Sequence, residues 1–314
     1  MNLSTSISTL LIGGAGYIGT HLARALIAGG RQVTVLGRRP APLQSLPPGA
    51  VYLQGDFGDE ALLARLLASH GEVVHLAFAT SPNTSFDNPL TDLQQNLLPA
   101  SQLFTLAAKT GSKLLLVSSG GAVYGDALAL PISELHPTRP ISPYGVTKLA
   151  IESYARLYAS SHGLKVICVR PANAYGIGQR PFTGQGFIST AMASAMRGQP
   201  VSIFGTTGTV RDYVYISDVA TGLASALMHG RIGETYNLGS GVGLSNKDVL
   251  DAMSPLLGEM GYALHIQHLP ERSSDVKTNV LDARQLMQET GWVPRIPLAE
   301  GLRLTADWLR TTHG

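Results

Sequence analysis

Short apolar runs alternate with longer helical patterns through the first half of this chain. The runs have the length and composition of buried parallel strands, and they fall at 7–12, 32–36, 72–76, 113–117 and 165–170. The stretches between them carry apolar residues at helical spacing, at 17–28, 59–68, 89–110 and 143–162. Such alternation is typical of helices that cover both faces of one sheet. We therefore predict an α/β fold with a doubly wound parallel sheet.

The sequence GGAGYIG at 13–19 directly follows the first predicted strand and opens the first predicted helix. The spacing of Gly13, Gly16 and Gly19 allows a tight turn, a close backbone approach to a pyrophosphate and close helix packing. The N-terminus of the helix adds its dipole and its N–H groups. Three glycines alone also fit an ordinary turn. In this strand–turn–helix context they predict a dinucleotide-binding site.

The pattern loosens into loops, helical pieces and short strands after about residue 171, with strands expected at 201–204 and 213–216. We predict a dinucleotide-binding Rossmann domain at 1–171. A smaller mixed α/β substrate domain is expected at 172–314, with a cleft between the two. This division leaves open that the chain crosses from one domain to the other.

Composition excludes several classes of protein. The 23 Lys+Arg against 21 Asp+Glu give a net charge of only +2. This charge does not indicate binding to nucleic acid or to an anionic membrane. Cys168 is the one cysteine, so no disulfide framework or multi-cysteine metal site is expected. The N-terminus does not resemble a signal peptide, and the sequence has no apolar stretch of about 18 residues. We expect a cytoplasmic protein without a metal.

The residues after the second predicted strand bear on the choice of cofactor. Leu36 is followed by Gly37, Arg38 and Arg39, where an NAD-binding Rossmann fold usually places an acidic residue for the ribose hydroxyls. A guanidinium can instead bind a 2′-phosphate through two hydrogen bonds. The alternative is that both arginines are solvated loop charges. The pattern favours NADP over NAD, either of them tightly bound.

Tyr144 and Lys148 stand four residues apart in SPYGVTK, on a predicted helix with Ser142 as N-cap and Pro143 at its first position. Four residues apart, they share one helix face, so the ammonium is expected to lower the pKa of the phenol from about 10. A tyrosine tuned in this way can exchange a proton with a sugar hydroxyl while a nicotinamide takes or gives a hydride. We predict that this pair is catalytic.

With these motifs in place, the whole chain resembles an extended short-chain dehydrogenase/reductase of the nucleotide-sugar epimerase and dehydratase family. It most resembles the UDP-sugar 4-epimerases of that family. Nine stretches carry the resemblance: GGAGYIG (13–19), GDFGD (55–59), VVHLA (73–77), SSGGAVYG (118–125), SPYGVTK (142–148), VRPANAYG (169–176), VRDYVYISDVA (210–220), YNLGSG (236–241) and PERSSDV (270–276).

The resemblance implies a set of cofactor contacts. Asp56 and Phe57 would lie against the adenine, although Asp56 could also cap a helix. Leu76 and Ala77 would line the nicotinamide side. Asn96 would lie near the cofactor on a helix that Pro99 kinks. The remaining implied cofactor residues are Tyr17, Ile18, Ser118 and Pro171, together with the pair Tyr144 and Lys148. His75 and Cys168 are expected to be core residues, with the histidine's polar groups satisfied.

The resemblance also implies contacts to a sugar nucleotide. Asn173 would contact the diphosphate sugar, and Arg211 and Arg272 would clamp the diphosphate, although each arginine alone also fits a solvated surface. Asp275 would accept a hydrogen bond from the nucleotide ribose, and Phe204 would pack on the base. Asn279 would lie beside the C2 substituent of the sugar, where its amide could bind an acetamido group. The alternative for Asn279 is a solvent-facing position.

One position departs from the family pattern. The family places Ser or Thr three residues before the valine of VYG, to bond the reacting C4 oxygen, and this chain has Gly120 there. Dehydratases of the family also need an Asp-Glu pair, which Gly121 and Ala122 replace, so dehydration is disfavoured. We hypothesise that Ser119 supplies the missing hydroxyl.

The resemblance therefore implies a nucleotide-sugar 4-epimerase of the UDP-N-acetylglucosamine/UDP-glucose type, which oxidises C4 transiently. An NADPH-dependent 4-keto-sugar reductase is the alternative, and a dinucleotide-binding regulatory module without catalysis is an alternative of another class. The family also implies a homodimer in which helices near 89–110 and 143–162 form a four-helix bundle. No nucleic acid or membrane partner is expected.

Overall fold

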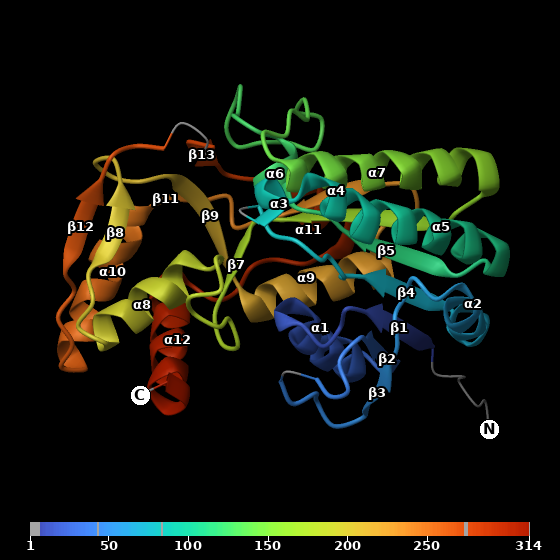
Figure 1. The fold of residues 1–314 in the computed structure, drawn as a ribbon, viewed down its shortest axis with the longest axis horizontal. Helices are drawn as coiled ribbons and strands as arrows, with labels where there is room; N and C mark the ends of the chain where they lie inside the picture. Colours follow the sequence, from blue (N-terminus) through green and yellow to red (C-terminus); the bar gives the residue numbers. More distant parts are fainter. Residues whose placement is uncertain (1–6, 43, 83, 273–275, 314) are drawn as a thin grey trace.

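A seven-stranded, fully parallel sheet forms the larger lobe of the computed structural model, which describes residues 7–42, 44–82, 84–272 and 276–313 (Figure 1). The strand order is β10-β6-β5-β4-β1-β2-β3. The bounds are β1 Ser8–Ile12, β2 Gln32–Gly37, β3 Ala50–Gln54, β4 Glu72–His75, β5 Lys113–Val117, β6 Val166–Pro171 and β10 Thr235–Leu238. The predicted α/β fold with a doubly wound sheet is confirmed.

Helices cover both faces of this sheet. On one face, α1 (Tyr17–Ala28), α9 (Ile216–His229) and α11 (Arg284–Thr290) enclose a core that includes Leu22 and Val35. On the other face, α2 (Glu60–Ser69), α5 (Leu98–Thr110) and α7 (Pro143–His162) enclose a second core. Because the strands are buried on both faces, they are continuous apolar runs rather than alternating ones.

The chain crosses between the two lobes. It leaves the large sheet after β6 and then returns to it with α9 and β10, so residues beyond 171 complete the Rossmann layer. The smaller lobe, on the left of Figure 1, contains two small sheets and three helices. Its elements are β7 Asn173–Tyr175, β9 Val210–Tyr215, β11 Gly243–Ser245, β13 Thr278–Asn279, β8 Val201–Phe204, β12 Ile266–Leu269, α8 Phe187–Met196, α10 Asn246–Glu259 and α12 Leu298–His313.

The stretch predicted as one helix at 89–110 is divided into α4 (Pro89–Asp92), a π-helical turn η1 (Leu93–Leu97) and α5. Pro99 follows this turn and has no N–H to donate to the carbonyl of Gln95, which disfavours regular α-geometry here. Two short helices complete the element list: α3 (Thr84–Asp87) and α6 (Gly120–Val123).

Helix α7 begins and ends where the sequence predicts. The Ser142 hydroxyl accepts a hydrogen bond from the Gly145 N–H at 3.1 Å, and Pro143 occupies the first turn. Gly163 ends the helix in the left-handed conformation, with φ 68°. This cap fixes the direction in which Tyr144 and Lys148 leave the first two turns. None of the described helices is long and apolar enough to cross a membrane.

Candidate active site

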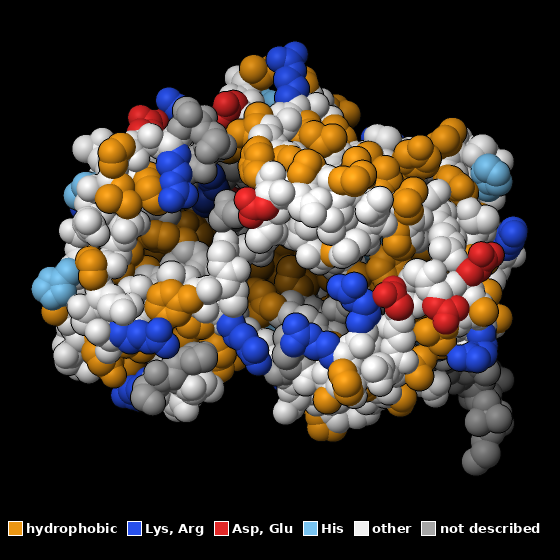
Figure 2. All heavy atoms as spheres, in the orientation of Figure 1, with side chains coloured by type: hydrophobic (Ala, Val, Ile, Leu, Met, Phe, Trp, Pro, Cys, Tyr) orange, Lys and Arg blue, Asp and Glu red, His pale blue; other side chains and the backbone are white. Residues whose placement is uncertain are grey.

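Two cavities of about 540 and 520 Å³ open at the carboxyl ends of the parallel strands, where ligands bind in open α/β sheets. The first, which we call the glycine-turn cavity, lies over β1, β2 and β4 and includes Gly13, Gly37 and Ala77. The second, the Tyr144 cavity, lies over β5 and β6 and reaches the smaller lobe. Figure 2 shows the molecule hollowed between its two lobes.

The glycine turn has the geometry that a pyrophosphate requires. Gly13 has φ +80°, and a Cβ there would lie 2.7 Å from the backbone nitrogen of Ala77. A Cβ on Gly19 would lie 2.5 Å from the Cα of Gly14, so only glycine lets α1 pack this closely on the turn. Helix α1 begins at Tyr17, and no side chain caps its N-terminus. The turn and the helix end therefore fit a dinucleotide phosphate.

Arg38 lines the glycine-turn cavity with an exposed side chain, where a 2′-phosphate could be bound. Arg39 is exposed and is not among the described residues that line the glycine-turn cavity. Its carbonyl accepts a hydrogen bond from the Tyr52 hydroxyl at 2.7 Å. That hydroxyl would lie 2.8 Å from a Cβ on Gly37. The Tyr52 ring therefore occupies the space in which an acidic side chain at 37 would begin.

Asp56 and Phe57 both line the glycine-turn cavity. The Asp56 carboxylate accepts a hydrogen bond from the Gly58 N–H at 2.9 Å, so it shapes the loop after β3. The alternative in which Asp56 caps a helix is wrong, because Asp59 is the N-cap of α2 and accepts from the Leu62 N–H at 3.1 Å.

His75 is buried beside the Phe57 ring, at 5.3 Å between centroids, as expected of a core residue. The expectation that its polar groups are satisfied is wrong. Neither ring nitrogen has a hydrogen-bond partner among the described residues. Burial lowers the pKa of His75 to about 3, so it is neutral near pH 7 and is no proton donor. Cys168 is also buried, and burial raises the pKa of its thiol.

Leu76, Ala77 and Asn96 form the wall of the glycine-turn cavity beyond β4. The N–H groups of Leu76 and Ala77 both donate to the Ile12 carbonyl, at 2.9 and 3.0 Å. The Asn96 side-chain oxygen accepts from the Ala79 N–H at 2.7 Å, and its amide donates to the Asp92 carbonyl at 2.8 Å. Asn96 therefore fixes the loop after β4 against the π-helical turn.

Tyr144 stands where the two cavities meet. It lines the Tyr144 cavity, and its ring packs edge-on against Phe78, which lines the glycine-turn cavity, at 4.7 Å between centroids. The Lys148 ammonium lies 4.1 Å from the Phe78 centroid and donates to the Val117 carbonyl at 3.0 Å. Tyr144, Phe78 and Lys148 thus form one packed cluster between the cavities.

The predicted lowering of the phenol pKa by Lys148 is wrong for this structure. Burial raises the pKa of Tyr144 to about 12; a hydrogen bond from Ser119 opposes this shift and the Asp92 carboxylate adds to it. Burial lowers the pKa of Lys148 to about 8, against the opposing effects of Cys168, Glu152 and Asp92. Desolvation outweighs the lysine because its ammonium is bonded to a carbonyl and lies 5.8 Å from the Tyr144 centroid.

Ser119 and Gly120 begin the short helix α6. Ser119 and Tyr144 both line the Tyr144 cavity, and the Ser119 hydroxyl opposes the rise in the pKa of the Tyr144 phenol. A Cβ on Gly120 would lie 2.4 Å from Cδ1 of the buried Leu281 and 3.1 Å from the Arg170 carbonyl oxygen. No side chain fits at Gly120, and the nearest hydroxyl to Tyr144 along this turn is the one predicted, Ser119.

The polar side chains of the Tyr144 cavity come from both lobes. Asn173, Arg211 and Arg272 all line it, and the Arg211 guanidinium donates to the Val210 carbonyl at 2.8 Å. The Arg272 guanidinium stacks on the Phe204 ring at 3.5 Å. Among the described lining residues, these arginines carry the positive charge and none carries a carboxylate. Asp275 lies outside the described residues.

Four residues predicted to bind cofactor, Tyr17, Ile18, Ser118 and Pro171, line the Tyr144 cavity instead of the described wall of the glycine-turn cavity. The Ser118 hydroxyl donates to the Glu152 carboxylate at 2.5 Å. Tyr17 and Ile18 begin α1, Ser118 follows β5 and Pro171 ends β6.

Asn279 is neither solvent-facing nor part of the described cavity wall. It is 1% exposed, and its amide donates to the Gly120 carbonyl at 3.0 Å, while its side-chain oxygen has no partner among the described residues. Strand β13 places this side chain behind α6. The prediction that it faces the sugar C2 substituent is therefore not supported by the geometry.

Three further residues shape the site without having been predicted. Phe78 packs under Tyr144 and Lys148, and no sequence signal marks it. Asp92 is fully buried, accepts from the Thr80 hydroxyl and raises the pKa of Tyr144. Glu152 lies four residues after Lys148, so the helical spacing that links Tyr144 to Lys148 also reaches it.

Comparisons with known proteins agree with this architecture. The sequence profile of the NAD dependent epimerase/dehydratase family matches residues 9–239. A UDP-glucose 4-epimerase of Mycolicibacterium smegmatis is 32% identical over 310 residues, covering 96% of this chain and 98% of that protein. A dTDP-glucose 4,6-dehydratase of an Actinoplanes species is 30% identical over 318 residues, covering 97% and 98%.

Solved structures are similar over the same length. The Thermotoga maritima UDP-glucose 4-epimerase with UDP-glucose has a TM-score of 0.90 and 32% identity, covering 98% of this chain and 100% of that chain. The Thermus thermophilus UDP-glucose 4-epimerase in complex with NAD has a TM-score of 0.87 and 33% identity, with the same coverage. The chain therefore belongs to the NAD dependent epimerase/dehydratase family.

Proposed function

We propose that this protein is a nucleotide-sugar 4-epimerase that acts on UDP-hexoses by transient oxidation at C4, with Tyr144 as the acid and base. One observation carries the proposal: the hydroxyls of Ser119 and Tyr144 line a cavity that contains two arginines, and the Tyr144 ring packs on Phe78 of the neighbouring dinucleotide-type cavity. A sugar held in the second cavity meets both hydroxyls beside the first. The UDP-glucose 4-epimerases among the similar proteins support the same reaction.

The chain's own residues would divide the work as follows. Arg211 and Arg272 offer planar donors for the diphosphate, which leaves the sugar beside Tyr144. Ser119 would donate a hydrogen bond to the C4 oxygen, and Tyr144 would take its proton and later return it. When bound, the oxidised dinucleotide supplies the two-electron acceptor for the C4–H bond and the positive charge of its ring. A positive charge in the glycine-turn cavity favours the Tyr144 phenolate.

The lining of the Tyr144 cavity supports epimerisation over dehydration. Elimination of water from the sugar needs an acid and a base near C5 and C6, and Gly121 and Ala122 line the cavity where a dehydratase has its Asp-Glu pair. None of the described lining residues is an aspartate or a glutamate. A reaction that needs one hydroxyl acid/base and one hydrogen-bond donor fits this cavity better.

We also propose that the protein is a homodimer. Six large apolar side chains are more than two-fifths exposed over α4, η1, α5 and α7, and Figure 2 shows hydrophobic side chains gathered over α7. A contiguous exposed apolar face of this kind marks an interface. The six are Leu90, Leu93, Leu98, Val146, Tyr154 and Leu157.

The activity is tested by incubating the purified protein with UDP-, dTDP- and GDP-sugars and reading C4 stereochemistry by NMR. The panel includes UDP-glucose, UDP-N-acetylglucosamine and their C4 epimers. We expect interconversion of a UDP-hexose pair without added NADPH, because the reaction is redox-neutral. Stoichiometric consumption of NADPH with a 4-keto sugar would identify a reductase instead, and no turnover of any sugar would contradict the proposal.

A further inference from the structure

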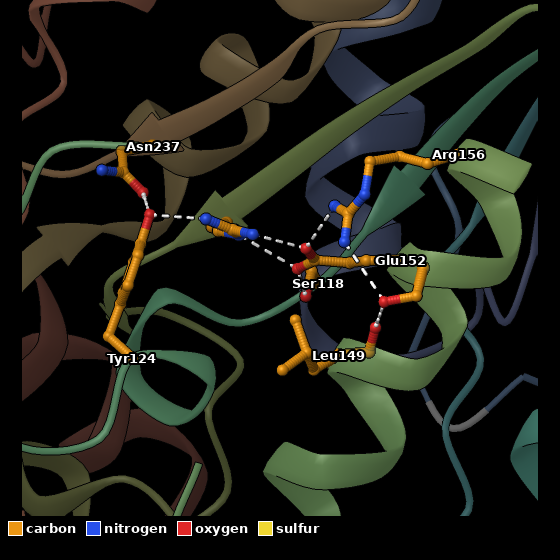
Figure 3. A network of polar contacts seen from close by, with 8 residues as sticks. Ser118, Tyr124, Leu149, Glu152, Arg156 and Asn237 are labelled. Atoms are coloured by element: carbon orange, nitrogen blue, oxygen red, sulfur yellow. Dashed lines mark hydrogen bonds and ion pairs between the residues drawn. The ribbon is translucent and has the colours of Figure 1, made fainter. Parts of the chain in front are cut away.

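A buried polar chain runs behind the Tyr144 cavity, and Glu152 is at its centre (Figure 3). The Glu152 side chain has no exposed surface. Its carboxylate accepts from the Arg170 guanidinium at 3.0 and 2.5 Å and from the Ser118 hydroxyl at 2.5 Å. Glu152 therefore joins α7 to the ends of both β5 and β6.

Ser118 is the residue through which this chain reaches the site. Its N–H donates to the Val169 carbonyl at 2.8 Å, so both its backbone and its side chain are fixed. The next residue is Ser119, which lines the same cavity as Tyr144 and whose hydroxyl opposes the rise in the pKa of the phenol. The Ser119 carbonyl in turn accepts from the Ala122 and Val123 N–H groups at 3.3 and 3.2 Å, so the backbone is held on both sides of the Ser119 Cα–Cβ bond.

The other end of the polar chain holds the far side of α6. Arg170 donates to the Tyr124 hydroxyl at 2.8 Å, and that hydroxyl donates to the Asn237 side-chain oxygen at 2.7 Å. Tyr124 is the residue that ends α6. The short helix after Ser119 is thus tied at its end by the same guanidinium that binds Glu152.

A buried ion pair of this kind is a poor source of stability, because desolvation of two charges offsets their attraction. Apolar residues of similar volume would hold α7 on β6 at least as well. The pair does provide direction, since a carboxylate that accepts hydrogen bonds from Arg170, Ser118 and Arg156 has few side-chain orientations available.

We propose that Glu152 is a positioning residue for the reaction. By holding Ser118 in place, it orients the Ser119 hydroxyl toward Tyr144 and toward the C4 oxygen of the sugar. This inference rests on the proposed function, which assigns Ser119 and Tyr144 to that oxygen. Glu152 itself does not line either cavity among the described residues.

Ser118→Ala is the variant that tests the proposal with least disturbance to the fold, because it removes one hydroxyl and leaves the ion pair of Glu152 and Arg170. We expect kcat to fall about ten- to a hundredfold, since a misplacement of about 1 Å costs up to about a hundredfold. KM for the sugar should change less than about twofold. Arg156→Ala is the matched control: Arg156 also contacts Glu152, but at 3.4 Å and with a half-exposed side chain, and it should keep wild-type kcat.

A double-mutant cycle that combines Ser118→Ala with Ser119→Ala distinguishes a positioning role from a general structural role. If Ser118 acts through Ser119, adding Ser118→Ala to Ser119→Ala causes no further loss of kcat. Independent, multiplying losses would overturn the proposal. Glu152→Leu with Arg170→Met removes the acceptor without leaving a buried charge unpaired, because Arg156 is half-exposed, and it should lose as much kcat as Ser118→Ala. Full kcat in a folded protein with this pair of substitutions would also overturn it.

A readout without substrate distinguishes failure of this proposal from failure of the proposed function. In protein labelled with ¹³C-tyrosine, the Cζ resonance of Tyr144 is assigned by its absence in Tyr144→Phe. Ser118→Ala should move this resonance toward its position in Ser119→Ala, and Arg156→Ala should leave it in place. An unmoved resonance in Ser118→Ala refutes the positioning role. A wild type that turns over no sugar refutes the function and leaves this resonance test valid.

Discussion

Gly120→Ser would restore the hydroxyl that the family pattern places at this position, and the structure predicts that the restored hydroxyl destabilises the protein without serving the reaction. The added Cβ would lie 2.4 and 3.2 Å from the two methyl carbons of Leu281 and 3.1 Å from the Arg170 carbonyl oxygen. Leu281 is fully buried in the core beneath α6, and the carbonyl belongs to strand β6. The Arg170 carbonyl cannot move away without disturbing the sheet, and the Leu281 methyl groups can move only by repacking against the core around them.

The expected cost follows from overpacking. Forcing extra atoms into a packed core costs about 1–3 kcal/mol. The unfolding entropy of about 2.1 cal/mol/K per residue means that 1 kcal/mol lowers the Tm of a chain of 314 residues by about 1.5 °C, so Gly120→Ser should lower Tm by about 1.5–4.5 °C. The reacting hydroxyl remains Ser119, so kcat should fall or stay level. Leu281→Ala removes the two clashing methyl carbons, so adding Gly120→Ser to Leu281→Ala should cost less than adding it to the wild type.

Differential scanning calorimetry and C4 epimerisation followed by NMR check both parts. Gly121→Ser is a control, because a Cβ there has only one neighbour, the Asn173 side-chain oxygen at 3.4 Å. A Gly120→Ser protein with unchanged Tm and a higher kcat would refute the reasoning. It would show that the space exists and that the family position is the working one.

Four further results are expected. Tyr144→Phe should lower kcat about 10²–10⁴-fold while dinucleotide binding, followed by fluorescence, stays near wild type, because only the proton-transferring oxygen is lost. Arg38→Ala should weaken NADP binding about tenfold more than NAD binding in calorimetric titrations, and equal effects would show that Arg38 is only a solvated charge. Leu157→Asp should convert a dimer into a monomer in light scattering, whereas a wild type that is already monomeric would rule out the proposed interface. The rate should fall above about pH 8 as Lys148 loses its proton. If the pH–rate profile of Lys148→Met shows the same alkaline decline, another group causes it.

The strands and helices that carry a strong hydrophobic pattern could be predicted from the sequence, and those defined by their neighbours could not. Strand β5 (KLLLV) is an apolar run, and the sequence marks the start of α7 with the N-cap Ser142 and with Pro143. Strand β10 (TYNL) contains the buried Asn237, whose side chain bonds the Tyr124 hydroxyl and the Ile132 carbonyl. Its place beside β6 is set by those tertiary contacts, which no local pattern reports.

The site shows the same division. The Tyr144–Lys148 spacing and the glycine turn follow from helix geometry and from backbone sterics, so the sequence reveals them. The position of Asn279 depends on a two-residue strand paired with β9, and its side chain lies behind α6 rather than beside a sugar. The pKa values of Tyr144 and Lys148 depend on how deeply α7 is buried, so the predicted direction for the phenol was wrong.

Burial also sets the order in which the catalytic pair titrates, and this order links activity to stability. Lys148, with a pKa of about 8, loses its proton before Tyr144, with a pKa of about 12, although the ordinary values are 10.5 and 10.0. In the unfolded chain Lys148 keeps its proton up to about pH 10.5, so between pH 8 and 10.5 the unfolded state binds more protons and stability rises with pH. Burial of the charged ammonium lowers the free energy of unfolding by at most about 3 kcal/mol below pH 8, and this loss of stability becomes smaller as the pH rises above 8. If the proposed reaction uses the positive charge of Lys148, 5.8 Å from the centroid of the Tyr144 ring, its rate should decline in that same interval. Wild type should therefore gain stability relative to Lys148→Met between pH 8 and 10 while its rate falls, and a parallel decline of both would show that another group governs the alkaline limb.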